Sequence, residues 1–161
     1  MKASRQIIIT LISFHFFASC TMIDSFRDSY YSDHIGKHSL YYGDFGEINS
    51  LYDVSIWIWH NIEFREETGD NWPSPQETVE RGWADCKGIS LLAINILKTE
   101  LNLEFDLALM DRDPRTVISG GVVDHAEIFH NNTLYKALYL PNTYEPSVEI
   151  CYLYKHEDIF E

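Results

Sequence analysis

Basic side chains are scarce in this sequence. Its 161 residues include 12 lysines and arginines against 25 aspartates and glutamates, which gives a formal net charge of -13. A surface this acidic repels the phosphate backbone of DNA and RNA, so we expect no nucleic-acid partner. The charge does not say what the partner is, because a solvated acidic surface also simply keeps a protein soluble.

Long apolar runs, internal repeats and low-complexity segments are also missing. The apolar run "IIITLISFHFF" covers residues 7–17 and is shorter than the roughly 20 residues that a membrane-spanning helix needs. It follows Lys2 and Arg5 and precedes small residues, which is the pattern of a secretory signal. We therefore interpret residues 1–19 as a signal peptide.

The end of that segment reads "FASC" and resembles the lipobox of bacterial lipoproteins. The resemblance implies that Cys20 is acylated and becomes the mature N-terminus, although Phe17 stands where the usual leucine would be. The lipid would anchor the protein to a membrane of the bacterial cell envelope, facing the periplasm or the cell surface. An ordinary signal peptide followed by a chance cysteine is the alternative.

Cysteine is rare as well, with three in the chain. If Cys20 carries a lipid, Cys86 and Cys151 remain, in a compartment that permits disulfides. These two cysteines either pair or both stay reduced, and their number alone does not decide between the two states.

The rest of the chain divides into a polar tether, residues 20–47, and one domain, residues 48–161. Helical spacing begins at Ile48 and closes at Glu66–Glu67, and capping signals predict further helices at residues 75–81 and from Cys86 to about residue 102. Period-two patterns then predict strands at residues 103–110, 122–129, 134–140 and 147–154. Helices followed by an antiparallel sheet make an α+β fold.

Cys86 is predicted to begin a buried helix, with Asp85 as its N-cap. Unsatisfied N–H groups and the positive end of the helix dipole favour a thiolate and can bind an oxyanion. His125 is the histidine that begins a predicted core strand, and the intervening helix, strand and loop allow it to fold back against the helix start. The alternatives are an inert core cysteine and a satisfied core histidine.

Three segments resemble the transglutaminase-like superfamily, in particular its small bacterial cysteine-peptidase-like members. They are "NWPSPQETVERGWADCKG", "ISLLAINILKTELNLEFDLAL" and "DHAEI". The resemblance implies a papain/transglutaminase-like core, in which the cysteine-bearing helix packs on the sheet. It also implies that Cys86 is the nucleophile and His125 the general base and acid. Trp72 would donate its indole N–H to the oxyanion, as in some relatives, or would simply be a rim aromatic packed on the helix.

The sequence departs from this family after the histidine. An aspartate on the following strand usually orients the imidazole, but that strand reads "LYKALYL" here. A hairpin turning at Asn131–Asn132 places Leu138 opposite His125 and Lys136 opposite Glu127. A bulge would be needed to bring Asn142 or Glu145 to the ring instead. Lys87 also stands where the family often has an acidic residue.

The sequence thus predicts a thiol-dependent hydrolase or acyl transferase that acts on a peptide or amide bond of a protein or peptide substrate. The alternative is a catalytically degenerate binding or scaffold module on the same lipid-anchored fold. We expect no cofactor and no metal, because the acidic residues between positions 111 and 127 lack the ligand spacing of a specific cation site. These acids are Asp111, Asp113, Asp124 and Glu127.

Overall fold

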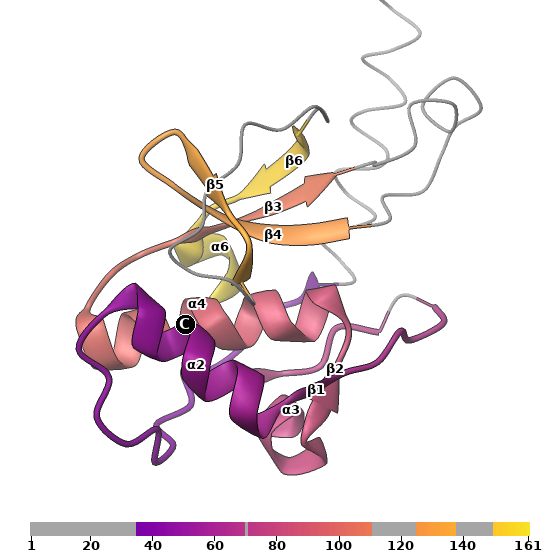
Figure 1. Cartoon of the computed structure of the whole chain (residues 1–161). Coiled ribbons are helices and arrows are strands. Elements are labelled where there is room, and N and C mark those ends of the chain that lie inside the picture. The colour runs from indigo at the N-terminus through magenta and orange to yellow at the C-terminus, as the bar shows by residue number, and fades with distance from the viewer. Residues whose placement is uncertain (1–34, 70, 111–124, 138–149) are drawn as a thin grey trace, which may run out of the picture. The chain divides into compact units, whose positions relative to one another are not determined.

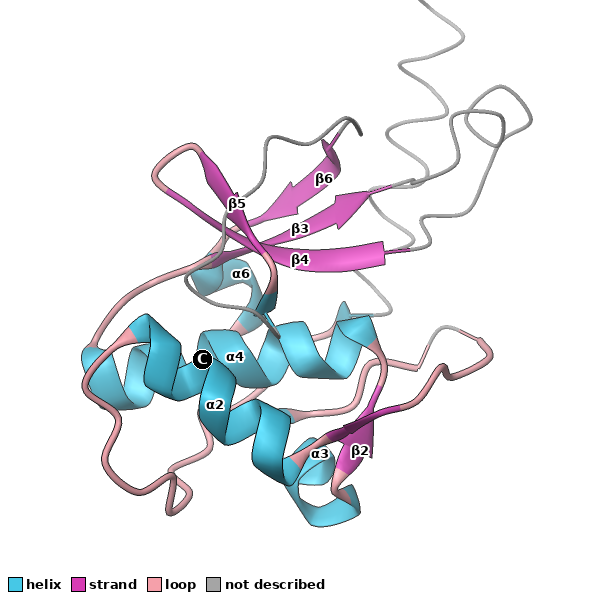
Figure 2. Ribbon diagram, viewed as in Figure 1, coloured by secondary structure: helices cyan, strands magenta, loops and turns pink. Residues whose placement is uncertain are grey.

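Helices and an antiparallel sheet form the main body of the protein. The computed structural model describes residues 35–69, 71–110, 125–137 and 150–161. The described residues from Lys37 to Glu161 belong to one compact unit, in which α2 (Leu51–Asn61), α3 (Pro75–Arg81) and α4 (Cys86–Leu101) lie beside the sheet (Figure 1; Figure 2). This mixed architecture confirms the α+β class.

Helix α2 (Leu51–Asn61) begins at Ser50, whose hydroxyl accepts a hydrogen bond from the N–H of Asp53. The helix was expected to continue to residue 67, and this prediction is wrong. Ile62 is extended, and β1 (Glu63–Phe64) pairs in parallel with β2 (Trp83–Ala84). This pairing gives the N–H of Glu63 a partner in the carbonyl of Gly82, 2.9 Å away. A contact between segments so far apart leaves no trace in the local spacing of apolar residues.

Helix α3 (Pro75–Arg81) has the predicted bounds. The Ser74 hydroxyl accepts from the N–H of Glu77, and the Glu77 carboxylate accepts from the N–H of Ser74, which completes a capping box. Gly82 ends the helix at a φ of 68°, a left-handed conformation that glycine adopts without steric cost. The chain then passes through β2 directly into the helix that carries Cys86.

Helix α4 (Cys86–Leu101) also has the predicted start, with the Asp85 side chain accepting from two first-turn N–H groups. Residues on every face of this helix are buried. They include the stripe with helical spacing, Ile89, Leu92, Ala93, Ile96 and Leu97, and also Ser90, Leu91, Ile94 and Asn95. α4 is therefore the central helix of the domain and contacts α2, α3 and the strand β4 (His125–His130).

The four-stranded antiparallel sheet has the order β5-β4-β3-β6. Its strands are β3 (Asp106–Met110), β4 (His125–His130), β5 (Thr133–Tyr135) and β6 (Ile150–Tyr154). The hairpin turns at Asn131–Asn132 and pairs Ile128 with Tyr135, which confirms the predicted register. Residues 122–124, 138–140 and 147–149 of the predicted strands lie outside the described residues.

Strand β3 starts three residues later than predicted. Asn102 ends α4 in a left-handed conformation with a φ of 53°. The N–H of Leu103 then donates to the carbonyl of Leu97, 3.0 Å away. The N–H of Leu103 is thus used by the C-terminal cap of the helix, although the alternating pattern had assigned this residue to the strand.

The segment before α2 packs on the domain. Tyr41 exchanges two backbone hydrogen bonds with the buried amide of Asn95, each 2.8 Å long. The ring of Phe45 is buried and meets Trp57 edge to face, with 5.0 Å between the ring centroids. At the other end of the chain, α6 (His156–Ile159) leads to Phe160, which bridges to His38.

Candidate active site

Cys86 is the first residue of α4, and the residue is partly exposed. Asp85 holds this end of the helix, because its Oδ1 accepts from the N–H of Lys87 at 3.0 Å and of Gly88 at 3.3 Å. Cys86 is a thiol in this structure, not half of a disulfide. The side chain of Cys151 and the whole of Cys20 lie outside the described residues.

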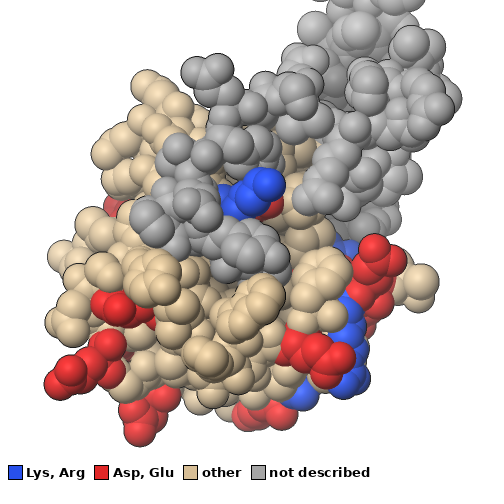
Figure 3. Space-filling model, in the orientation of Figure 1, with Lys and Arg blue, Asp and Glu red and all other residues tan. Residues whose placement is uncertain are grey.

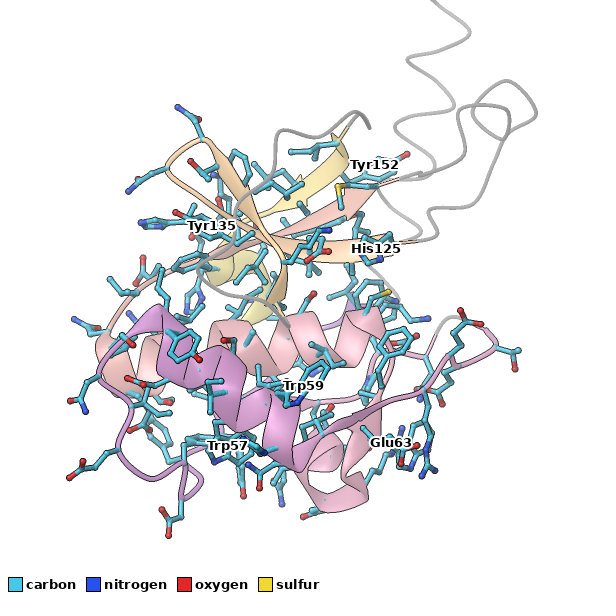
Figure 4. All side chains as sticks on the ribbon, viewed as in Figure 1. Trp57, Trp59, Glu63, His125, Tyr135 and Tyr152 are labelled. Carbon is cyan, nitrogen blue, oxygen red and sulfur yellow. The ribbon has the colours of Figure 1, made fainter. Side chains whose placement is uncertain are left out.

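A side-chain hydrogen bond joins the first half of α4 to β4. The hydroxyl of Ser90 donates to the carbonyl of Ala126, 3.1 Å away, and both residues are buried. Ser90 follows Cys86 by about one helical turn and lies on the same face of the helix. Ala126 directly follows His125, which begins β4. The structure therefore brings the end of β4 that carries His125 to the start of α4 (Figure 4).

His125 is held by a carboxylate from its own strand. Its Nε2 lies 2.6 Å from Oε1 of Glu127, and the two side chains are only 11% and 7% exposed. The second oxygen of Glu127 accepts a hydrogen bond from the N–H of Ala137 at 3.1 Å. Because the ring and the backbone beyond β5 both hold this carboxylate, it cannot turn away without breaking one of the two contacts.

Glu127 is the residue that sequence reasoning missed as a partner of the histidine. The orienting residue was expected on the following strand, where the predicted hairpin places Lys136 opposite Glu127. The overlooked signal is the alternation in "HAE", because residues two apart on a strand point to the same face. The other two candidates for this role, Asn142 and Glu145, lie outside the described residues.

Trp72 lies beside the start of α4. Its side chain is buried, and its Nε1 has no hydrogen-bond partner among the described residues. The ammonium of Lys87 lies 5.8 Å from its ring centroid. A Cβ placed on Gly88 would come within 2.8 Å of Pro73, the residue after Trp72. Trp72 can therefore pack beside the start of α4 and still have its indole N–H available as a hydrogen-bond donor.

Trp83 occupies the short approach to Cys86. The guanidinium carbons of Arg65 and Arg81 each lie 5.6 Å from the centroid of its ring. Two further contacts hold these arginines, an ion pair of Arg65 with Glu63 at 2.6 Å and a longer one of Arg81 with Glu67 at 3.9 Å. Basic side chains on the face shown in Figure 3 are thus accompanied by acidic ones.

Comparison with known proteins adds no relative. The chain matches no family model, no curated protein and no solved structure. Within the described ranges, no helix is long and apolar enough to cross a membrane. The part of the chain that the structure describes also contains no cluster of three metal-ligating side chains. Functional conclusions about this chain therefore depend on its own residues and their geometry.

Proposed function

We propose that this protein is a thiol-dependent hydrolase or acyl transferase with a papain/transglutaminase-like core, acting on peptide or amide bonds through Cys86 and His125. One observation carries the proposal. A buried carboxylate, Glu127, grips the imidazole of His125 at 2.6 Å, at the end of β4 that Ser90 fastens to the Cys86 helix. An orienting carboxylate behind a histidine is the arrangement that activates a neighbouring nucleophile.

The two ring nitrogens of His125 have different roles in this reaction. The carboxylate of Glu127 accepts a hydrogen bond from the Nε2–H of the ring, so the neutral tautomer carries its lone pair on Nδ1. Nδ1 takes the proton of the Cys86 thiol as the sulfur forms a bond to the substrate carbonyl carbon. The same proton then passes to the departing amine as the carbon–nitrogen bond breaks. Water or a second amine attacks the resulting thioester and restores the thiol.

Oxyanion stabilisation is assigned to the helix start and to Trp72. The carbonyl oxygen gains negative charge when the thiolate attacks, and N–H groups fixed in place stabilise it. We assign this role to the N–H of Cys86 and to the indole N–H of Trp72. A buried N–H that has no hydrogen-bond partner among the described residues supports the second assignment, since leaving such a group unpaired costs about 1–3 kcal/mol unless a ligand compensates.

Thiol labelling tests the Cys86–His125 pair without knowledge of the substrate. Iodoacetamide alkylation of the full chain is followed over pH 5–9, and mass spectrometry of peptides separates Cys86 from the other cysteines. Cys86 should still be alkylated at pH values well below about 8.5, the pKa of an ordinary cysteine thiol. His125→Ala should slow it at pH 6 by about tenfold or more, a difference of about 1.4 kcal/mol. Equal, slow labelling of the wild type and His125→Ala refutes the proposal.

The role of Glu127 is tested in the same assay. Glu127→Gln keeps the size of the side chain but removes its charge. It should therefore slow the alkylation of Cys86 at pH 6, as His125→Ala does. Glu104→Gln is the matched control, because Glu104 pairs with Lys98 on the exposed surface. Glu104→Gln should label like the wild type, and a Glu127→Gln profile that also matches the wild type removes Glu127 from the mechanism.

A second candidate function is a binding or scaffold module, and one surface favours it. Tyr52, Ile56 and Trp59 lie on one face of α2 and are 57%, 37% and 59% exposed. An apolar row of this kind is typical of an interaction surface. Under this alternative, Ile56→Glu abolishes binding to whatever partner copurifies with the full chain, whereas Cys86→Ala leaves it intact. Under the enzyme proposal, Cys86→Ala abolishes turnover.

We further propose that a lipid on Cys20 anchors the domain in the bacterial cell envelope. The "FASC" sequence and the preceding apolar run support this part of the proposal. The mass of the mature protein should correspond to a chain that starts at Cys20 and carries acyl groups, and Cys20→Ala should remove the lipid. An unmodified chain starting elsewhere contradicts it.

A further inference from the structure

Lys87, the residue after Cys86, has an unusual position for a lysine. Its side chain is only 15% exposed, whereas lysines are rarely buried unless they are paired. The ammonium donates a hydrogen bond to the carbonyl of Gly69 at 2.7 Å and lies 3.3 Å from Oδ2 of Asp85. It also lies 5.8 Å from the centroid of Trp72. The side chain of the residue after Cys86 thus contacts Gly69, Asp85 and Trp72.

The contact with Gly69 holds the chain that leads to Trp72. Gly69 has a φ of +102°, a conformation that strains any other residue, and its carbonyl is bound by Lys87. Three residues later the Trp72 ring lies within cation–π distance of the same ammonium. Lys87 therefore fastens the backbone at Gly69 and the ring of Trp72 to the first turn of α4.

The contact with Asp85 concerns charge. Asp85 is required as a cap, but its buried carboxylate stands directly before Cys86 and opposes the formation of a second negative charge there. The ammonium of Lys87, at 3.3 Å, offsets this field. Among the described residues of the sheet, the His125–Glu127 pair is also brought to this end of α4. Without Lys87, the Asp85 carboxylate next to the thiolate would lose this compensating positive charge.

We propose that Lys87 is a positioning residue of the Cys86 site, which neutralises the cap carboxylate and holds Trp72 against the start of α4. This inference rests on the function proposed above. It gives a physical reason for a lysine at a position where the similar family often carries an acidic residue. The lysine permits a charged cap and a thiolate to coexist on adjacent residues.

The pH profile of Cys86 alkylation by iodoacetamide tests the charge role on the full chain. Lys87→Met should shift the midpoint upward by about one unit, which is about tenfold slower labelling at a pH below the midpoint. Lys87→Arg should restore the wild-type profile to within about threefold. Lys98→Met is the matched control, because Lys98 also pairs with a carboxylate, Glu104 at 2.6 Å, but at the far end of the same helix. A Lys87→Met midpoint equal to that of the wild type overturns the proposal.

Asp85→Asn provides a second variant that keeps the N-cap hydrogen bonds, since asparagine caps helices about as well as aspartate. It should shift the midpoint downward, because the opposing charge is removed. In the double variant Asp85→Asn, Lys87→Met the two shifts should largely cancel. A merely structural role for Lys87 would instead slow labelling at every pH and leave the midpoints unchanged.

Hydrogen exchange tests the holding role separately. A peptide that contains Asn71 and Trp72 should exchange faster in Lys87→Met than in the wild type, and Lys87→Arg and Lys98→Met should not differ from the wild type. Equal exchange in all four proteins refutes the proposal that Lys87 holds Trp72 against α4.

Failure of the proposed function can be distinguished from failure of this inference. A wild-type thiol that labels like an ordinary cysteine refutes the proposed function and this inference together, whereas an activated wild type with an unshifted Lys87→Met refutes this inference alone.

Discussion

The hydroxyl of Ser90 and the carbonyl of Ala126 lie 3.1 Å apart and form a buried hydrogen bond between α4 and β4. Each residue is close in sequence to a member of the proposed site, since Ser90 lies one turn after Cys86 and Ala126 directly follows His125. The bond therefore fixes the register between the helix that carries the thiol and the strand that carries the imidazole. Apolar packing alone leaves such a register free to slide by small amounts, whereas a hydrogen bond requires a short distance and a defined direction.

Replacing Ser90 by alanine should affect both stability and the site. The loss of this hydrogen bond leaves the Ala126 carbonyl unpaired and should lower the free energy of unfolding by about 1–2 kcal/mol in urea denaturation. Cys86 alkylation at pH 6 should also slow severalfold. Ser50→Ala removes an exposed cap of α2 and costs a similar stability of about 1 kcal/mol, so it is a suitable control. If both variants label like the wild type, the Ser90 bond does not align the site.

Asn95 should be essential for attaching the segment before α2. Its fully buried amide donates to the carbonyl of Tyr41 and accepts from the N–H of the same residue. Asn95→Ala loses both bonds and should cost about 2–4 kcal/mol of unfolding free energy, with faster proteolysis within residues 37–47. Asn61→Ala, which removes an exposed side chain, should change neither measurement much. Unchanged proteolysis in Asn95→Ala would show that other contacts hold the segment.

His156 should make stability depend on pH. Burial lowers its pKa from the ordinary value of 6.5, the nearby Lys98 also lowers it, and Glu104, Glu157 and Asp106 act in the opposite direction. The folded state therefore binds a proton less readily than the unfolded state. The contribution of His156 to the free energy of unfolding is fully present above pH 6.5, the pKa of an ordinary histidine. It is lost as the pH falls through the lower pKa of His156 in the folded state.

The measurement is the urea midpoint between pH 7.5 and 5.5. It should fall on acidification in the wild type and fall less in His156→Phe, which retains a ring to stack on Phe160. The control His60→Gln alters an exposed histidine and should follow the wild type. A fall of equal size in the wild type and His156→Phe assigns the pH dependence to other groups.

Gly88→Ala should destabilise the protein although alanine is the better helix former. A Cβ at this position would lie 2.8 Å from the Cβ of Ala84 and 2.8 Å from Cγ of Pro73. Overpacking of this kind costs about 1–3 kcal/mol, which exceeds the gain of about 1 kcal/mol in helix propensity. Glu100→Ala, on the exposed part of α4, should be nearly neutral in the same thermal denaturation. A Gly88→Ala variant more stable than the wild type would show that Pro73 can move away.

Local signals were sufficient for the elements that short-range contacts define. α3 begins at Pro75 because Ser74 and Glu77 complete a capping box, and α4 begins at Cys86 because Asp85 caps it. The hairpin register follows from Asn131 and Asn132, which adopt the positive φ angles of 50° and 61° that a tight turn requires. In each case the residues that determine the structure lie within a few positions of one another.

The sequence by itself determined where Cys86 and His125 lie in their elements, and it correctly indicated the α+β order. Only the tertiary structure decided that β1 ends α2 early, that Glu127 holds His125, and that Ser90 joins α4 to β4. The physical reason is the range of the contacts. A cap or a turn forms between neighbours in the chain, whereas parallel pairing and the alignment of a helix with a strand depend on segments that meet only after the core has packed.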